Sequence, residues 1–217
     1  AAYQDEAYAR EYVERLPPFV ALAESKGDAG QQSLAELARQ LALGMTYDDP
    51  VRVAELKIRD ARFERVHTEI GARPGQVIEI VEFMHPRIEE ITDTMPAAVG
   101  RWMLRSMPAR ALLTRLTSRG RKVRTTSLRG FLLLYVVASL KAFRRGSMRH
   151  AREMRFLDGW LETVRHAAGI DILLATEFAR LRNLVKGYGD TFERGHVKYR
   201  TIAAFMSGRL HHPAAAM

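Results

Sequence analysis

The sequence of 217 residues contains no cysteine. This absence excludes disulfide bonds, thiolate zinc sites, cysteine-ligated iron–sulfur clusters and a cysteine nucleophile within the chain. It is compatible with a reducing compartment, and residues 1–10 lack the apolar core of a signal peptide, so we expect a cytoplasmic protein. The sequence also does not begin with methionine, and we therefore expect a fragment of a longer chain.

Long hydrophobic runs are missing as well. The longest apolar run is Phe131–Leu140, and Lys141, Arg144 and Arg145 follow it closely. A helix needs roughly 20 apolar residues to cross a bilayer. We interpret the run as a buried helix and expect no membrane partner.

Acidic residues are absent from one long stretch of the sequence, between Asp93 and Glu153. This basic stretch holds 14 basic residues, whereas the rest of the chain carries 20 basic and 25 acidic residues. The net charge of +9 therefore comes from one section. Such a section can attract phosphate, nucleic acid, anionic lipid or an acidic protein surface. The alternative is that its arginines pair with acidic residues elsewhere in the fold.

The hydrophobic and charged fractions, 47% and 27%, are typical of a globular protein. Apolar residues recur mostly at helical spacing, so we predict a mainly α, multi-helix globular fold. We expect a single helical domain over residues 1–217, with at most a minor extended segment near 76–84. Residues 208–217 read as a flexible tail.

Several local elements carry distinct expectations. The segment Gln76–Met84 alternates polar and apolar residues but lacks an obvious strand partner. We expect a basic loop over Gly120–Thr126 and one helix over Val51–Ile70. A loop over Gly27–Gly30 precedes Ser33, which has Glu three residues on and so predicts a helix start.

The sharpest local feature is the glycine segment Lys186–Gly195, with the sequence KGYGDTFERG. Glycines permit tight turns and close approach to the backbone, and the segment also supplies cations and a hydroxyl group. A loop of this kind can hold an anion near a helix N-terminus. The candidate residues are Lys186, Gly187, Tyr188, Gly189, Thr191 and Arg194. The alternative is a helix C-cap in which Gly187 takes the left-handed conformation.

Other groups of residues give weaker indications of a functional site. His85 with Glu82 or Glu89 could form an acid–base pair, although the glutamates equally suit a helix start. The seven histidines show no metal-binding spacing, so we predict no metal site. Trp102 and Trp160 lie in helical surroundings and are predicted core residues rather than stacking platforms.

Several phrases together resemble one family. They are Tyr3-Gln4-Asp5 with Tyr8-Ala9, Ala54–Arg59, Glu82–Pro86 with Ile88–Ile91, Pro96–Trp102, Thr126–Leu132 and Leu184–Thr191 with Glu193-Arg194-Gly195. Together they are similar to the C-terminal helical region of bacterial indolepyruvate ferredoxin oxidoreductases, in the beta-subunit and fused forms. The resemblance extends from about Tyr3 to Tyr199, and the glycine segment is its most specific part.

That family converts aryl 2-oxoacids to acyl-CoA with thiamine diphosphate, iron–sulfur clusters, CoA and ferredoxin. The resemblance implies an accessory, non-catalytic domain that docks on other domains or a subunit of the parent oxidoreductase, or contacts an anionic ligand. No catalytic residue can be carried over, and no cofactor is expected in this segment. The alternative is a basic nucleic-acid-binding helical module formed by residues 101–152.

Overall fold

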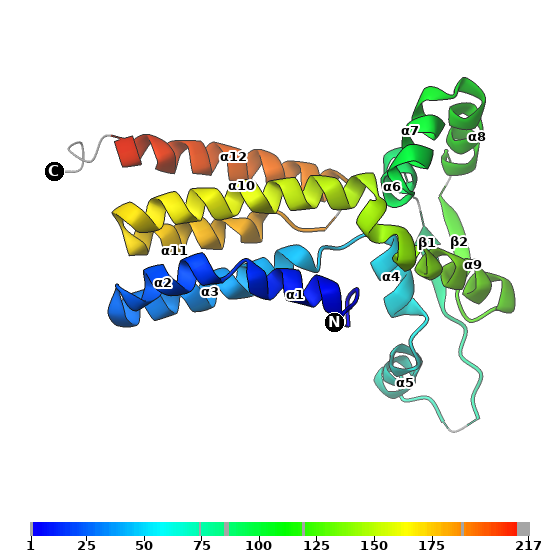
Figure 1. The fold of residues 1–217 in the computed structure, drawn as a ribbon. Coiled ribbons are helices and arrows are strands. Elements are labelled where there is room, and N and C mark those ends of the chain that lie inside the picture. Colours follow the sequence, from blue (N-terminus) through cyan, green and yellow to red (C-terminus); the bar gives the residue numbers. More distant parts are fainter. Residues whose placement is uncertain (1, 74, 85–86, 119, 188, 212–217) are drawn as a thin grey trace. The chain divides into compact units, whose positions relative to one another are not determined.

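The computed structural model describes residues 2–73, 75–84, 87–118, 120–187 and 189–211. Helices form most of this part of the chain, and two short strands form one small sheet (Figure 1). The predicted mainly α fold is therefore confirmed. The chain divides into two compact units, residues 1–47 with 152–217 and residues 48–151. Because this division rests on contacts and not on independent folding, the single domain over 1–217 stays a prediction.

In its described residues the first unit contains helices and no strand. They are α1 (Glu6–Glu14), α2 (Pro17–Glu24), α3 (Gly27–Met45), most of α10 (Met148–Ile170), α11 (Ile172–Leu181), the short 3₁₀ helix η2 (Arg182–Leu184) and α12 (Gly189–His211). Helix α3 is central, since it contacts α1, α2 and α11, and α11 in turn contacts α12. Asp5 and Asp171 begin α1 and α11 as caps, each accepting a hydrogen bond from a backbone N–H of the first turn.

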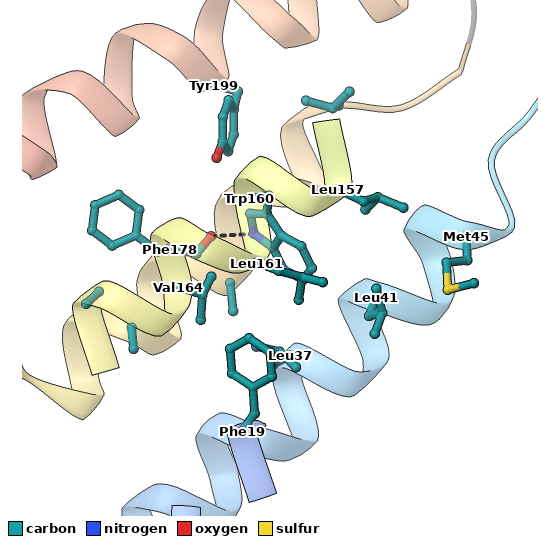
Figure 2. Close-up of a cluster of buried hydrophobic side chains, with 14 of the residues drawn as sticks. Phe19, Leu37, Leu41, Met45, Leu157, Trp160, Leu161, Val164, Phe178 and Tyr199 are labelled. Atoms are coloured by element: carbon teal, nitrogen blue, oxygen red, sulfur yellow. Dashed lines mark hydrogen bonds between the residues drawn. The ribbon is translucent and has the colours of Figure 1, made fainter. Parts of the chain in front are cut away.

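The core of this unit forms where α3, α10 and α11 face one another (Figure 2). Trp160 lies at its centre, and the indole N–H donates to the carbonyl oxygen of Phe178 at 3.0 Å. Leu37 and Leu41 of α3 belong to the same buried cluster as Leu157 of α10. The hydrogen bond satisfies the one polar atom of the indole, so burial of the large ring is favourable.

Two tyrosines tie the N-terminus to this core. The hydroxyl of Tyr3 donates to the carbonyl oxygen of Tyr47 at 2.8 Å, and that of Tyr8 donates to the carbonyl oxygen of Met45 at 2.9 Å. Both acceptors lie at or just beyond the end of α3, where carbonyls lack helical partners. The tyrosines therefore stabilise the C-terminus of α3 as well as filling the core.

The second unit is a set of shorter elements. They are α4 (Pro50–Lys57), α5 (Asp60–Glu69), β1 (Val81–Met84), α6 (Ile88–Thr94), α7 (Ala97–Arg105), α8 (Met107–Thr117), β2 (Arg121–Arg124), α9 (Leu128–Ser139), the 3₁₀ helix η1 (Leu140–Gly146) and the first turn of α10. Helix α4 packs on α9, and α6 packs on both α7 and α8. A small cluster of Ala54, Leu134 and Ala138 is buried between α4 and α9.

Several local predictions are wrong. The predicted loop at Gly120–Thr126 contains β2, which pairs antiparallel with β1 and gives the predicted extended segment near 76–84 its partner. The helix expected over Val51–Ile70 is two helices, α4 and α5, separated at Ile58 and Arg59. The loop expected at Gly27–Gly30 is the first turn of α3, and the buried Ser33 lies inside that helix.

The C-terminal end also differs from its prediction. Helix α12 runs to His211, so the first residues of the predicted flexible tail at 208–217 are helical. Residues 212–217 lie outside the described residues. The wrong predictions at Gly120–Thr126 and at residues 208–211 have a similar origin. Strand pairing in the first segment and helix propagation in the second extend into residues whose local composition predicts a loop or a tail.

Candidate functional site

The glycine segment is a turn followed by a helix, rather than an open loop. Gly187 has a φ of +70° and Gly189 a φ of +59°, both in the left-handed region that favours glycine. Gly189 begins α12, so Thr191 and Arg194 lie on exposed positions of that helix, and Lys186 is exposed before it. Tyr188 lies outside the described residues. The left-handed Gly187 expected of a C-cap is confirmed, and the anion site stays a prediction.

The last glycine of the segment has a packing role. A Cβ atom at Gly195 would lie 2.2 Å from the carbonyl oxygen of Leu184, so only glycine allows α12 to approach η2 this closely. On the same helix, the rings of Phe192 and His196 lie 4.5 Å apart, and Phe156 of α10 lies 4.5 Å from His196. The most specific part of the sequence therefore docks α12 onto its own unit.

The predicted acid–base residues have structural partners where they are described. Glu82 of β1 forms ion pairs with Lys57 of α4 and Arg62 of α5. These pairs hold the strand against two helices. His85 lies outside the described residues, and Glu89 lies in the first turn of α6, where a negative charge is favourable.

Glu55 is a second charged centre of this unit. Its carboxylate accepts hydrogen bonds from Arg59 at 2.7 Å and Arg52 at 2.9 Å, and Lys141 of η1 lies 3.5 Å away. Partial burial raises the pKa of Glu55, but the hydrogen bonds from Arg59 and Arg52 outweigh it and hold the pKa below its ordinary value. The carboxylate therefore stays charged and links α4 to η1.

One ion pair of the basic stretch is buried. The guanidinium Nε of Arg144 donates to Asp49 at 2.9 Å, and the two side chains are 2% and 4% exposed. Asp49 also caps α4 by accepting from the backbone N–H of Arg52. Since both partners are enclosed and matched, this pair has a structural role and leaves neither charge available to a ligand.

The basic stretch divides into paired and unpaired residues. Lys141, Arg144 and Arg124 form ion pairs with acidic residues of the same unit. A second group is exposed and forms no ion pair with any described residue: Arg101, Arg105, Arg110, Arg115, Lys122 and Arg129. The pairing expected as the alternative therefore accounts for part of the stretch only. The unpaired group gives this unit a positive surface.

Helix α9 exposes an apolar face within this stretch. Its buried line, with Leu134 and Ala138, packs against Ala54 of α4. Five other large apolar side chains of this helix are about half exposed or more: Leu128, Leu132, Leu133, Tyr135 and Val136. The interpretation of Phe131–Leu140 as a buried helix is therefore wrong for most of its circumference. The sequence did contain a signal for this exposed face. A helix that is buried along one line needs apolar residues on that line only, whereas this run is apolar on all sides.

Helix α7 carries an open hollow of about 480 Å³. Its lining is Ala98, Arg101, Trp102, Arg105 and Ser106. Trp102 is 62% exposed, whereas Trp160 is 1% exposed. The predicted core position is thus confirmed for Trp160 and wrong for Trp102.

Two features that would indicate other functions are missing from the described ranges. No group of His, Asp or Glu side chains there is arranged to hold a metal ion. No helix of the described chain has the length and apolar character that crossing a membrane requires.

Comparison with known proteins places the chain at the family level. No curated protein and no solved structure matches it. A family model does match, and it spans residues 1–204. The chain therefore belongs to DUF6537, a family of unknown function.

Proposed function

We propose that this chain is an accessory, non-catalytic helical domain of a 2-oxoacid ferredoxin oxidoreductase of the indolepyruvate type. Its role would be to dock on another domain or subunit of that enzyme. The proposal is supported by the resemblance of the sequence phrases from about Tyr3 to Tyr199. The observation that carries the docking role is the exposed apolar face of α9, which lies within the basic stretch.

The chemistry of this face favours a protein partner. Leu128, Leu132, Tyr135 and Val136 recur at intervals of four, three and one, so they lie along one side of α9. Leaving such side chains in water is unfavourable, and covering them stabilises a complex by roughly 25 cal/mol per Å². Exposed Arg129 and Lys122 carry positive charge at the same unit's surface. A complementary partner has an apolar centre and an acidic rim.

The cofactors of the parent enzyme would be held elsewhere. The chain has no cysteine, so its residues do not fit an iron–sulfur cluster. We assign no step of thiamine diphosphate or CoA chemistry to residues of this chain. Its contribution to turnover would come through assembly alone.

The test is co-purification with the segments that carry the thiamine-binding and cluster-binding regions. Leu132→Glu adds a charge to the centre of the α9 face, and we expect it to reduce recovery of the complex at least tenfold. Leu173→Glu is the matched control, because Leu173 is 66% exposed on α11, in the other unit. It should leave recovery unchanged.

Activity gives the second readout of the same experiment. Ferredoxin reduction by the assembled enzyme should fall with the yield of complex in the Leu132→Glu variant, with turnover per complex unchanged. The proposal fails if deletion of this domain, residues 1–217, from the parent enzyme alters neither assembly nor turnover. It also fails if Leu132→Glu and Leu173→Glu reduce recovery equally.

A further inference from the structure

The hollow on α7 combines an aromatic ring with two cations on one side of a helix. Ala98, Arg101, Trp102 and Arg105 follow one another at intervals of three, one and three residues, which places them on neighbouring positions of one helix face. Ala98, with its single methyl group, leaves room beside the indole. The hollow is open to solvent and has a volume of about 480 Å³, so a ligand can reach the indole and both guanidinium groups.

Trp102 is available for stacking. Its side chain is 62% exposed, although burial of so large an aromatic ring would be favourable. Trp160 gives the contrast within the same chain, since its ring is enclosed and its N–H is bonded to Phe178. The indole of Trp102 makes no comparable contact with the described residues, and its face can receive a planar group.

The two arginines are available for an anion. Arg101 and Arg105 are exposed and form no ion pair with a described residue. No acidic residue follows in the sequence until Glu153. Guanidinium groups bind phosphate through paired N–H donors, so this face presents phosphate donors directly beside a stacking ring.

We propose that α7 binds a nucleotide unit, through its base and its phosphate. The base stacks on Trp102, and the phosphate lies between Arg101 and Arg105. A mononucleotide and a single-stranded nucleic acid both carry this chemistry. The exposed indole matches the base of a nucleotide, and the two guanidinium groups match its phosphate. This site is separate from the apolar face of α9 and does not depend on the docking proposal.

The experiment titrates the whole chain with two probes at low salt, ATP without magnesium and a short fluorescently labelled oligothymidylate. Binding is followed by tryptophan emission and by anisotropy of the labelled strand. Because Trp160 is enclosed, quenching by a stacked base reports Trp102. Equal affinity of the two probes per site identifies a mononucleotide ligand, whereas much tighter binding of the strand, weakening steeply with salt, identifies single-stranded nucleic acid.

The variants separate a local site from general charge. Trp102→Ala should weaken binding about fivefold or more, since stacking on an aromatic side chain contributes at least that much, and Trp102→Phe should retain most of it. Arg101→Gln and Arg105→Gln should each weaken binding and reduce its salt dependence. Arg110→Gln is the matched control, because Arg110 is an exposed, unpaired arginine on α8, outside the hollow.

Two results would overturn the proposal. One is the absence of binding of both probes to the wild-type chain at low salt. The other is a loss in Arg110→Gln as large as that in Arg101→Gln, because the binding would then come from the overall positive charge. Neither result bears on co-purification of the α9 variants.

Discussion

At the scale of single residues, identical chemistry has different consequences according to burial. Arg144 and Arg165 each bind a carboxylate through two guanidinium nitrogens, Arg144 to Asp49 and Arg165 to Glu162. The first pair is enclosed and the second lies in water. A buried charge that loses its partner cannot recover its hydration, whereas an exposed one can.

This contrast gives a prediction for stability. Arg144→Met leaves the carboxylate of Asp49 buried without its guanidinium partner and should lower the free energy of unfolding by about 3–5 kcal/mol. Arg165→Met is the control with the same bidentate geometry at the surface, and it should change stability little. Urea denaturation followed by circular dichroism measures both. Equal losses in the two variants would contradict the structural role of the buried pair.

At the scale of elements, one carboxylate connects α4 to η1. The pKa of Glu55 is lowered in the folded chain because hydrogen bonds from Arg59 and Arg52 outweigh the effect of burial. A lowered pKa means that its stabilisation is present above the ordinary value of 4.5 and is lost as the pH falls through the folded value. Acidification below 4.5 should therefore loosen this link.

The corresponding measurement compares Glu55→Gln with the wild-type chain. The variant should be less stable at neutral pH and should lose less stability on acidification, because it has no carboxylate to protonate at this position. Urea midpoints taken at neutral pH and below the ordinary glutamate pKa give the two differences. An equal decrease of the urea midpoint on acidification in the variant and the wild-type chain would show that Glu55 contributes nothing to the acid dependence of stability.

The elements also show what the sequence could predict. Helical spacing and the Asp-Pro start of α4 are local signals, and the mainly α fold followed from them. The pairing of β1 with β2 depends on residues some 40 positions apart, as in Glu82 with Val123, and no local pattern encodes such a partner. The exposure of Trp102 and of the α9 face likewise depends on which neighbours pack there. Helical periodicity predicts which side of a helix is apolar, but not which element covers that side.

At the scale of the whole molecule, the two units differ in how much apolar surface they bury. The first encloses Trp160, Phe178, Leu37, Leu41, Leu157 and their neighbours in one continuous cluster. The described cluster of the second contains Ala54, Leu134 and Ala138, and charged contacts such as that of Glu55 hold much of the rest. Because hydrophobic burial dominates stability, the second unit should open first.

This difference can be measured with the tryptophans that the chain provides. Trp102→Phe removes the exposed indole of the second unit and leaves Trp160 as the fluorescent reporter of the first. On addition of urea, helical circular dichroism should begin to fall before the emission of Trp160 shifts, since partial opening of the less apolar unit leaves the core of α3, α10 and α11 intact. Coincident transitions would mean that the chain unfolds as one cooperative body, and the small cluster around Leu134 would then owe its stability to the larger one.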